Sequence, residues 1–340
     1  MLDASSTFQG RNPFLFVVGC PRSGTTLLQR MLDGHPLLAV ANDSHFIPRC
    51  LETHVPHLVR QATGGVDVPL TPTLVRGVVG YHRYHRLGLD ALQGRAAARD
   101  VSSYRDFVSA LYDRFAARQG KPLGGEKTPD YVRRLPLLGG LFPGAHFVHI
   151  IRDGRDVALS VMSWANRRKG PGKLELWEAS PLATSALWWA WQVGSGCRDG
   201  RALPGRYLEV HYERLVVRPE DELRRITSFL HIPFAGEMLR YHEGKRKQNP
   251  GRSAKSNWLP PTPGLRDWRI QMGAEDVALF EALTGELLDE LGAERGCAQP
   301  LPQVLEAAAD YRRRWQAHLE RREAKTARRI RQAAAVGGSG

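Results

Sequence analysis

Apolar and polar positions follow one another in blocks that predict strands leading into helices. Residues 14–18 are continuously apolar and rich in Val and Phe, as in a buried strand, and the apolar spacing over residues 25–32 indicates a helix. The pattern recurs at residues 147–151, and again at residues 207–212, where alternation precedes a helix that begins at Pro219. Strands that alternate with helices predict an α/β fold with a mostly parallel sheet.

The segments between these units have less regular patterns. Residues 41–48 form a predicted polar turn, and the stretch that follows, up to residue 117, predicts helices that cover the sheet. Residues 244–268 are rich in Gly, Pro, Lys and Ser, which predicts a long ordered loop of the kind that often carries function. We expect one α/β domain over residues 1–300, a basic helical extension over 301–335 and a flexible tail over 336–340.

The charge balance indicates an anionic partner without naming it. The chain of 340 residues has 48 Lys and Arg against 35 Asp and Glu, a formal net charge of +13. Such an excess suits an anionic cofactor or acceptor, a nucleic acid or a membrane surface. Part of it lies in residues 310–332, where a solvated helix is the simpler interpretation than a polyanion contact. No nucleic-acid-binding motif accompanies the charge.

The four cysteines predict neither a zinc site nor a disulfide framework. They are widely spaced, with no C-x-x-C pair, so a reducing compartment is expected. No secretory leader pattern precedes Phe14, and no apolar run approaches the ~20 residues that span a bilayer. The sequence therefore predicts a cytoplasmic protein without a transmembrane segment.

The turn after the first predicted strand has the form of a phosphate-binding loop that lacks its lysine. Gly19 and Gly24 have the spacing of G-x-x-x-x-G-K-[ST], but Thr25 stands where the lysine belongs. A strand-to-helix turn directs backbone N–H groups at an anion, and Arg22 adds a fork of donors. A sulfonate carries one negative charge and needs less neutralisation than a phosphoryl group. The loop by itself fits sulfuryl transfer or a divergent phosphate loop.

Three motifs follow one another on the predicted strand–helix units: "CPRSGTTLLQRMLDGHP", "IIRDGRDVALSVMSW" and "YERL". Together they resemble the PAPS-dependent sulfotransferases, where PAPS is 3′-phosphoadenosine 5′-phosphosulfate. The tyrosylprotein sulfotransferase branch and its bacterial relatives are the most similar. Over roughly residues 13–268, the resemblance implies a P-loop-like sulfotransferase fold. It also implies transfer of the PAPS sulfuryl group to an acceptor hydroxyl (EC 2.8.2 type), with PAP as product and no metal.

The resemblance also implies which residues hold the cofactor. The first motif would cradle the 5′-phosphosulfate, the second the 3′-phosphate, and the tyrosine of the third would lie beside the adenine. A serine in the long loop would close on the 3′-phosphate, with two cations nearby. An arginine at a strand end and a hydroxyl two helical turns later can converge on one phosphate. The implied cofactor-binding residues are Arg22, Ser23, Gly24, Thr25, Thr26, Arg152, Ser160, Tyr212, Ser253, Lys255 and Arg266.

The catalytic roles that the resemblance implies are a base and cations near the departing oxygen. Counting from Arg22 places Asp43 where the family has its glutamate base, and His45 is a competing base. Lys127 in "GGEKTPDY" matches the family lysine and would act with Arg22. Each has a structural alternative: a turn or helix cap for Asp43, an ordinary buried histidine for His45, and a plain loop lysine for Lys127.

The acceptor stays open at this stage. An aspartate is one methylene shorter than the expected glutamate, and His45 replaces an arginine, so a carbohydrate, lipid, small phenol or peptidyl tyrosine all remain candidates. The tryptophans within residues 188–192 suit either an acceptor surface or the core. The rival functions are an NTP-dependent kinase and a polyanion-binding protein with an idle loop. The sequence does not fix the oligomeric state, and a homodimer is one option.

Overall fold

The structure is a computed structural model that describes residues 12–164, 175–243 and 259–337. None of the helices in these ranges is long and apolar enough to cross a membrane. Ser253 and Lys255, two of the expected cofactor-binding residues, lie outside the described residues, as does most of the long loop predicted over 244–268.

A parallel sheet forms the centre of the described chain. Its five strands run in the order β2-β3-β1-β4-β5, and every neighbouring pair is parallel. The strands are β1 (Leu15–Gly19), β2 (Leu38–Asn42), β3 (Leu123–Lys127), β4 (His146–Ile151) and β5 (Tyr207–His211). The predicted α/β class is confirmed. Because later strands lie on both sides of β1, their carboxyl ends form a crevice beside β1, where such sheets bind ligands.

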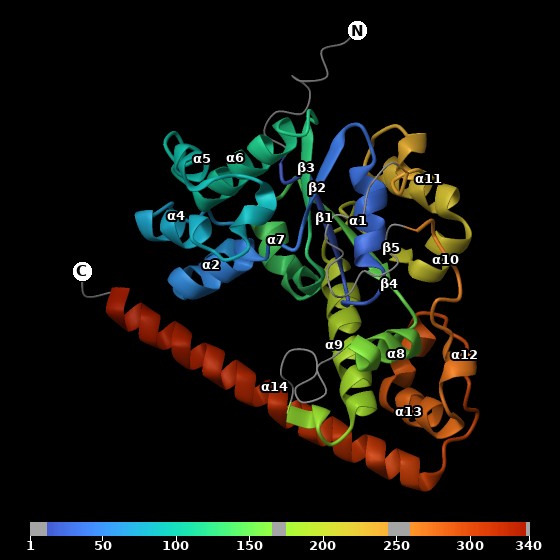
Figure 1. The fold of residues 1–340 in the computed structure, drawn as a ribbon. Helices are drawn as coiled ribbons and strands as arrows, with labels where there is room; N and C mark the ends of the chain where they lie inside the picture. Colours follow the sequence, from blue (N-terminus) through green and yellow to red (C-terminus); the bar gives the residue numbers. More distant parts are fainter. Residues whose placement is uncertain (1–11, 165–174, 244–258, 338–340) are drawn as a thin grey trace.

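Helices cover both faces of the sheet (Figure 1). On the side of the longest connection lie α2 (Phe46–His54), η1 (Pro56–Leu58), α3 (Val59–Thr63), α4 (Pro72–Val79), η2 (Tyr84–Leu87), α5 (Ala91–Ala96), α6 (Tyr104–Ala117), η3 (Pro129–Arg134) and α7 (Leu135–Leu141). The other face is covered by α1 (Thr25–Asp33), α10 (Tyr212–Val217), α11 (Pro219–Phe229) and η6 (Gly236–Met238).

The remaining helices form a third group at one end of the sheet, shown at the bottom of Figure 1. They are α8 (Gly154–Trp164), η5 (Glu175–Trp177), α9 (Pro181–Gly200), α12 (Trp268–Gln271), α13 (Ala274–Glu290) and α14 (Pro302–Gly337). Figure 1 shows α14 as one long helix that runs diagonally along this side of the molecule. It begins against α13, passes α9 and reaches η1.

The core explains why the first strand reads as a continuous apolar run. Phe16 and Val18 belong to the cluster under α2 to α7, whereas Leu15 and Val17 belong to the cluster under α1, α10 and α11. Successive side chains of a strand point to opposite faces, and both faces of this sheet are buried. All four side chains are fully buried. The sheet therefore needs apolar residues at consecutive positions of β1.

Two strands were not predicted from the sequence. β3 contains Gly124 and Gly125, where an added Cβ would lie 2.7 Å from the Tyr112 carbonyl oxygen and 2.8 Å from that of Leu15. The close approach of α6 and β1 requires these glycines, and they remove the apolar pattern of a strand. β2 overlaps the beginning of the predicted turn, so the turn itself is confined to residues 43–45. The third predicted strand ends at His211, and Tyr212 begins α10.

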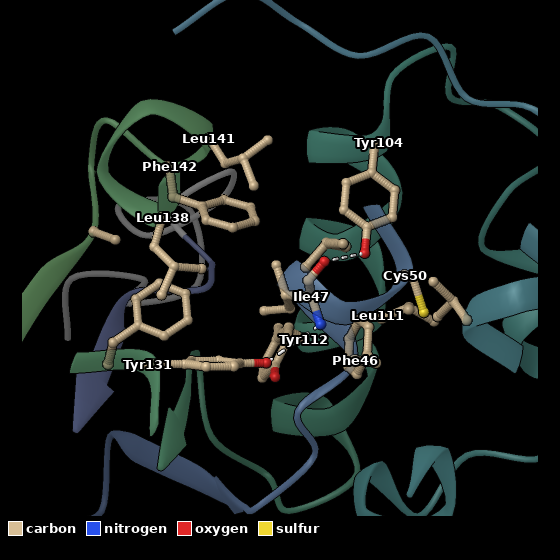
Figure 2. Close-up of a cluster of buried hydrophobic side chains, with 14 of the residues drawn as sticks. Phe46, Ile47, Cys50, Tyr104, Leu111, Tyr112, Tyr131, Leu138, Leu141 and Phe142 are labelled. Carbon is tan, nitrogen blue, oxygen red and sulfur yellow. Dashed lines mark hydrogen bonds between the residues drawn. The ribbon is translucent and has the colours of Figure 1, made fainter. Parts of the chain in front are cut away.

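Two tyrosine hydroxyls hold the first turn of α2 (Figure 2). The backbone N–H of Ile47, which has no partner within the helix at this position, donates to the Tyr131 hydroxyl at 3.3 Å. The hydroxyl of Tyr104 donates to the Ile47 carbonyl oxygen at 2.9 Å. Phe46 stacks on Tyr112, with ring centroids 6.2 Å apart. This buried cluster fixes the start of α2 and, with it, the turn over residues 43–45.

A polar contact links β4 to β5 inside the sheet. His149 lies opposite Glu209 in the register, and its Nδ1 is 2.6 Å from the Tyr207 hydroxyl, which donates to Glu209 at 3.0 Å. Burial lowers the pKa of His149 to about 3, with a smaller effect from His211. The imidazole is therefore neutral in the folded protein at neutral pH.

Candidate active site

The loop after β1 has the backbone geometry of an anion cradle. Arg22 and Gly24 both have positive φ angles, of 80° and 88°. A Cβ on Gly24 would lie 2.4 Å from the Tyr212 ring, so only glycine fits there. Thr25 begins α1 directly after this loop, and its backbone N–H belongs to the unpaired donors of the helix start. Ser23 Oγ is buried and has no hydrogen-bond partner among the described residues.

The two predicted phosphate motifs meet at a direct hydrogen bond. Arg22 Nε donates to Ser160 Oγ at 2.9 Å, across 138 residues of sequence. Arg152 follows β4, and its guanidinium carbon lies 4.3 Å from the centroid of the Tyr212 ring. Arg152 also pairs with Asp156 at 3.1 Å, while its Nε is buried without a partner in the described part of the chain. The structure therefore brings Arg22, Ser160, Arg152 and Tyr212 into one cluster.

The electrostatic character of this cluster is cationic. Burial lowers the pKa of Arg22, and the nearby Arg152 and Arg266 lower it further. Arg266, another expected cofactor-binding residue, donates to Ser163 Oγ at 3.1 Å, so it lies beside α8. Three guanidinium groups in one region create a positive potential, which a polyanion would relieve on binding.

A second cluster lies at the carboxyl ends of β2 and β3. Lys127, the last residue of β3, is almost completely buried, and its Nζ lies 3.0 Å from Asp43 Oδ2. The same Nζ is 3.4 Å from Thr26 Oγ1 in the first turn of α1. Burial lowers the pKa of Lys127, while the Asp43 carboxylate opposes that shift. Lys127 therefore lies between the loop that resembles a phosphate cradle and the carboxylate expected to act as a base.

The turn that carries Asp43 and His45 has two left-handed residues. Asp43 has φ 57° and His45 has φ 60°. Their side chains are 4.0 Å apart between His45 Nε2 and Asp43 Oδ1. Burial lowers the pKa of His45 to about 4, and Arg83 adds to that effect. The imidazole of His45 is therefore neutral at neutral pH, which is the form that accepts a proton.

Glu126 holds this turn in place through hydrogen bonds and was not identified from the sequence. Its carboxylate accepts hydrogen bonds from the backbone N–H of Ser44 at 2.8 Å and the Tyr112 hydroxyl at 2.6 Å, and a third from the Thr128 hydroxyl. The side chain is completely buried, and burial raises its pKa. The sequence offered no signal for this role, because β3 itself was not predicted and a buried charge can be recognised only once the strand is known.

Other residues of the second motif and the tryptophan segment are structural. Arg155 is fully buried and pairs with Asp153 at 2.6 Å and with Glu281 at 2.5 Å. Trp189 is buried in the core, and its indole N–H donates to the Arg152 carbonyl oxygen at 3.1 Å. Trp189 therefore fills the core and supports the strand end that presents Arg152.

A charged hollow adjoins the turn at His45. It opens directly to solvent. Its walls come from the end of the turn, α2 and η3, and its lining residues are His45, Pro48, Arg49, Glu52, Asp130, Tyr131, Arg133 and Arg134. The site therefore has a cationic side around Arg22 and Arg152 and an open side beyond Asp43.

Comparisons with known proteins agree with this geometry. A protein-family model described as "Sulfotransferase family" matches residues 13–236. The chain is 26% identical over 233 residues to "Protein-tyrosine sulfotransferase 1" of Danio rerio. The aligned region covers 68% of this chain and 56% of that protein. It is 29% identical over 309 residues to "Nodulation protein NoeE" of Sinorhizobium fredii (strain NBRC 101917 / NGR234), covering 82% of this chain and 66% of that protein.

The solved structures confirm the fold. The "Sulfotransferase Domain from the Synechococcus PCC 7002 Olefin Synthase" aligns with a TM-score of 0.52 at 24% identity, over 83% of this chain and 95% of that one. The coverage of the curated relatives is smaller: the chain spans little more than half of the Danio rerio protein.

Proposed function

Because the chain belongs to the sulfotransferase family, we propose that it transfers the sulfuryl group of PAPS to a hydroxyl group of an acceptor. The observation that carries this proposal is the hydrogen bond between Arg22 and Ser160, which joins the loop after β1 to the helix after β4. It places the groups expected to bind the two ends of one doubly phosphorylated nucleotide side by side.

The residues present fit such a nucleotide. The backbone at Gly24 leaves room where a Cβ would collide with Tyr212, and Ser23 Oγ and Arg152 Nε are buried donors without partners in the described residues. Buried polar groups are normally paired, so these donors indicate a missing anionic ligand. We infer that Arg22, Ser23, Gly24, Thr25 and Thr26 hold the 5′-phosphosulfate.

The second phosphate and the adenine are assigned to the residues after β4 and β5. Arg152 and Ser160 would hold the 3′-phosphate, and the Tyr212 ring would lie beside the adenine. Arg266 is close enough to Arg22 to influence its pKa and would add a third cation. The expected contributions of Ser253 and Lys255 remain proposals that rest on the family resemblance.

On the acceptor side, Asp43 is the proposed base. PAPS supplies a sulfuryl group whose bond to the 5′-phosphate oxygen breaks as the acceptor oxygen bonds to sulfur. The acceptor hydroxyl gives its proton to the Asp43 carboxylate, which Lys127 holds in place at 3.0 Å. Lys127 and Arg22 stabilise the charge that develops on the departing oxygen and the sulfuryl oxygens. His45, neutral and 4.0 Å from Asp43, is the alternative base.

The acceptor is proposed as a hydroxyl compound: a carbohydrate, a lipid, a small phenol or a peptidyl tyrosine. The name of the Danio rerio relative supports the last of these. All four cysteines are free thiols, which suits the cytoplasmic location that we propose.

The test is the thermal stability of the full chain with PAP, compared with ATP plus Mg²⁺ at matched ionic strength. A ligand that binds the folded state raises its apparent stability by about 2.7 kcal/mol at a concentration one hundred times its Kd. PAP should raise the Tm, and Arg152→Ala should remove most of that shift. A rise in Tm with ATP plus Mg²⁺, without any rise with PAP, would refute the proposal and favour a kinase.

A further inference from the structure

The backbone at Arg152, the arginine that follows β4, is held from two sides. Trp189 donates its indole N–H to the Arg152 carbonyl oxygen at 3.1 Å, and the backbone N–H of Asp153 donates to a Glu213 carboxylate oxygen at 2.9 Å. Gly154 then begins α8, and a Cβ there would lie 2.5 Å from the Trp189 ring. These contacts fix where the side chain of Arg152 leaves the backbone, but none of them involves its guanidinium group.

Asp156 fixes the guanidinium group itself. Both side chains are buried, and Arg152 Nη2 donates to Asp156 Oδ2 at 3.1 Å. The Tyr212 ring covers one face of the guanidinium, with 4.3 Å between the ring centroid and the guanidinium carbon. Because the carboxylate and the ring hold this planar group together, its orientation is set before a ligand binds. Its Nε, which has no partner in the described ranges, stays available to an anion.

The same carboxylate holds the start of α12. Asp156 Oδ1 accepts a hydrogen bond from the backbone N–H of Trp268 at 3.0 Å, across 112 residues of sequence. Two residues before Trp268, Arg266 donates to Ser163 Oγ at 3.1 Å, so this segment lies against α8. The two oxygens of Asp156 therefore connect Arg152 to the segment that carries Arg266. Both arginines are among the residues expected to bind the nucleotide.

A buried carboxylate beside an anion site has a cost, because its negative charge opposes the ligand. Asp156 lies in the first turn of α8, where the helix dipole favours an acid. That gain would be available equally to an acid of this turn that faced solvent. Contact with both Arg152 and Trp268 adds orientation instead. A guanidinium group that is already held in place loses less conformational freedom when a phosphate arrives.

We propose that Asp156 is a positioning residue of the nucleotide site, which orients Arg152 towards the 3′-phosphate and holds the segment that carries Arg266 against α8. The inference rests on the proposed use of PAPS. It concerns how the site distinguishes a nucleotide that has a 3′-phosphate from one that lacks it. Asp156 acts on the nucleotide through Arg152 and not by direct contact.

Two nucleotides test this role, because PAP and adenosine 5′-monophosphate differ only in the 3′-phosphate. The ratio of their Kd values, measured by calorimetry on the full chain, reports the advantage that the 3′-phosphate gives to PAP. The wild type should bind PAP more tightly. Asp156→Asn should reduce this advantage about tenfold, the effect of losing one hydrogen bond to a charged group, and leave the Kd of the monophosphate nearly unchanged. An amide has one acceptor oxygen and cannot serve both donors.

Two further variants complete the test. Asp156→Ala removes both hydrogen bonds without placing an NH₂ group beside the guanidinium, and it should reduce the advantage of PAP at least as far. Asp221→Asn is the matched control, because it makes the charge change of Asp156→Asn at an exposed position of α11. It should leave the advantage unchanged. Thermal unfolding checks that each variant is folded, and either variant of Asp156 is sufficient for the comparison.

The sign of the effect separates positioning from charge. If Asp156 acted mainly through its negative charge, its removal would strengthen PAP binding, so a larger advantage of PAP would overturn the proposal. An unchanged advantage, or an equal loss of affinity for both nucleotides, would also overturn it, since the 3′-phosphate would then not depend on Asp156. In these cases the wild type still binds PAP, and the proposed sulfuryl transfer stands. If the wild type does not bind PAP, the proposed function fails and this inference fails with it.

Discussion

Arg22 Nε donates a hydrogen bond to Ser160 Oγ at 2.9 Å, although the two residues are 138 positions apart. Arg22 comes from a loop with a positive φ, and Ser160 lies in the second turn of α8. A guanidinium oriented by a neighbouring hydroxyl loses less conformational freedom when an anion arrives. The contact therefore preorganises the proposed donor site before any ligand binds.

Ser160→Ala should weaken PAP binding. The change removes the acceptor for Arg22 Nε and one hydroxyl from the proposed 3′-phosphate site, and a hydrogen bond to a charged group contributes about 1.5–3 kcal/mol. The Kd for PAP, measured by calorimetry, should rise at least tenfold. Ser228→Ala, at an exposed position of α11, is the control and should leave the Kd unchanged. An unaltered Kd in Ser160→Ala would remove Ser160 from the nucleotide site.

Asp43→Asn should separate turnover from donor binding. Asparagine keeps the shape of the side chain but cannot accept the acceptor proton, and a general base contributes about 10²- to 10⁴-fold to the rate. PAP release in the presence of PAPS and a small phenol that the wild type sulfates should fall by that order, while the Kd for PAP changes little. His45→Asn provides the comparison. A full rate in Asp43→Asn together with a large loss in His45→Asn would assign the base to His45.

Glu126→Gln should affect both stability and turnover without weakening PAP binding. The amide offers one acceptor oxygen and places an NH₂ group where a carboxylate oxygen accepted a hydrogen bond from the Tyr112 hydroxyl or the Ser44 N–H. Leaving one buried group unpaired costs about 1–3 kcal/mol, which chemical denaturation can measure. The turn with Asp43 would lose its support, so kcat should fall. Tyr112→Phe removes one hydrogen bond only and should cost less on both measures; a normal kcat in Glu126→Gln would contradict this positioning role.

The stability of the protein should fall in mild acid because of His149. The pKa of His149 is about 3 in the folded protein and near 6.5 when unfolded, so below pH 6.5 the unfolded chain binds a proton that the folded chain excludes. The stabilisation is complete above pH 6.5 and declines as the pH falls towards 3. Between pH 7.5 and pH 5 the loss should be about 2 kcal/mol from this residue.

The measurement is the free energy of unfolding of the wild type and His149→Asn at both pH values. The variant lacks the titrating group, so the difference between the two proteins should change by that amount between pH 7.5 and pH 5. A difference that does not depend on pH would show that His149 is protonated in the folded state. His45, whose pKa is also low, contributes equally to both proteins and cancels.

The sequence predicts those parts of the fold that are determined by a pattern of neighbouring residues. β1 and β4 are recognisable because both of their faces are buried, and the loop after β1 because its glycines follow a known spacing. β3 is not recognisable from the sequence. The close approach of α6 and β1 requires Gly124 and Gly125 there, and these glycines interrupt the apolar pattern of a strand.

The same division applies to the candidate site. Asp43 could be placed by counting from Arg22, and Lys127 by the short motif around it, and the structure brings the two side chains to 3.0 Å. Glu126 could not, because its role depends on Ser44, 82 residues away in sequence. The path of α14 past α9 could not be predicted either, because no local pattern specifies where a helix packs.

The position of α14 has a consequence for the biogenesis of the protein. The cluster of Arg22, Ser160, Arg152 and Tyr212 lies entirely within the first 212 residues, whereas α14 begins at Pro302 and is synthesised after every other helix described. Domains generally fold from the N-terminal side during synthesis. A nascent chain can thus bring these four residues together while still attached to the ribosome, and only later does α14 emerge and pack against α9 and α13.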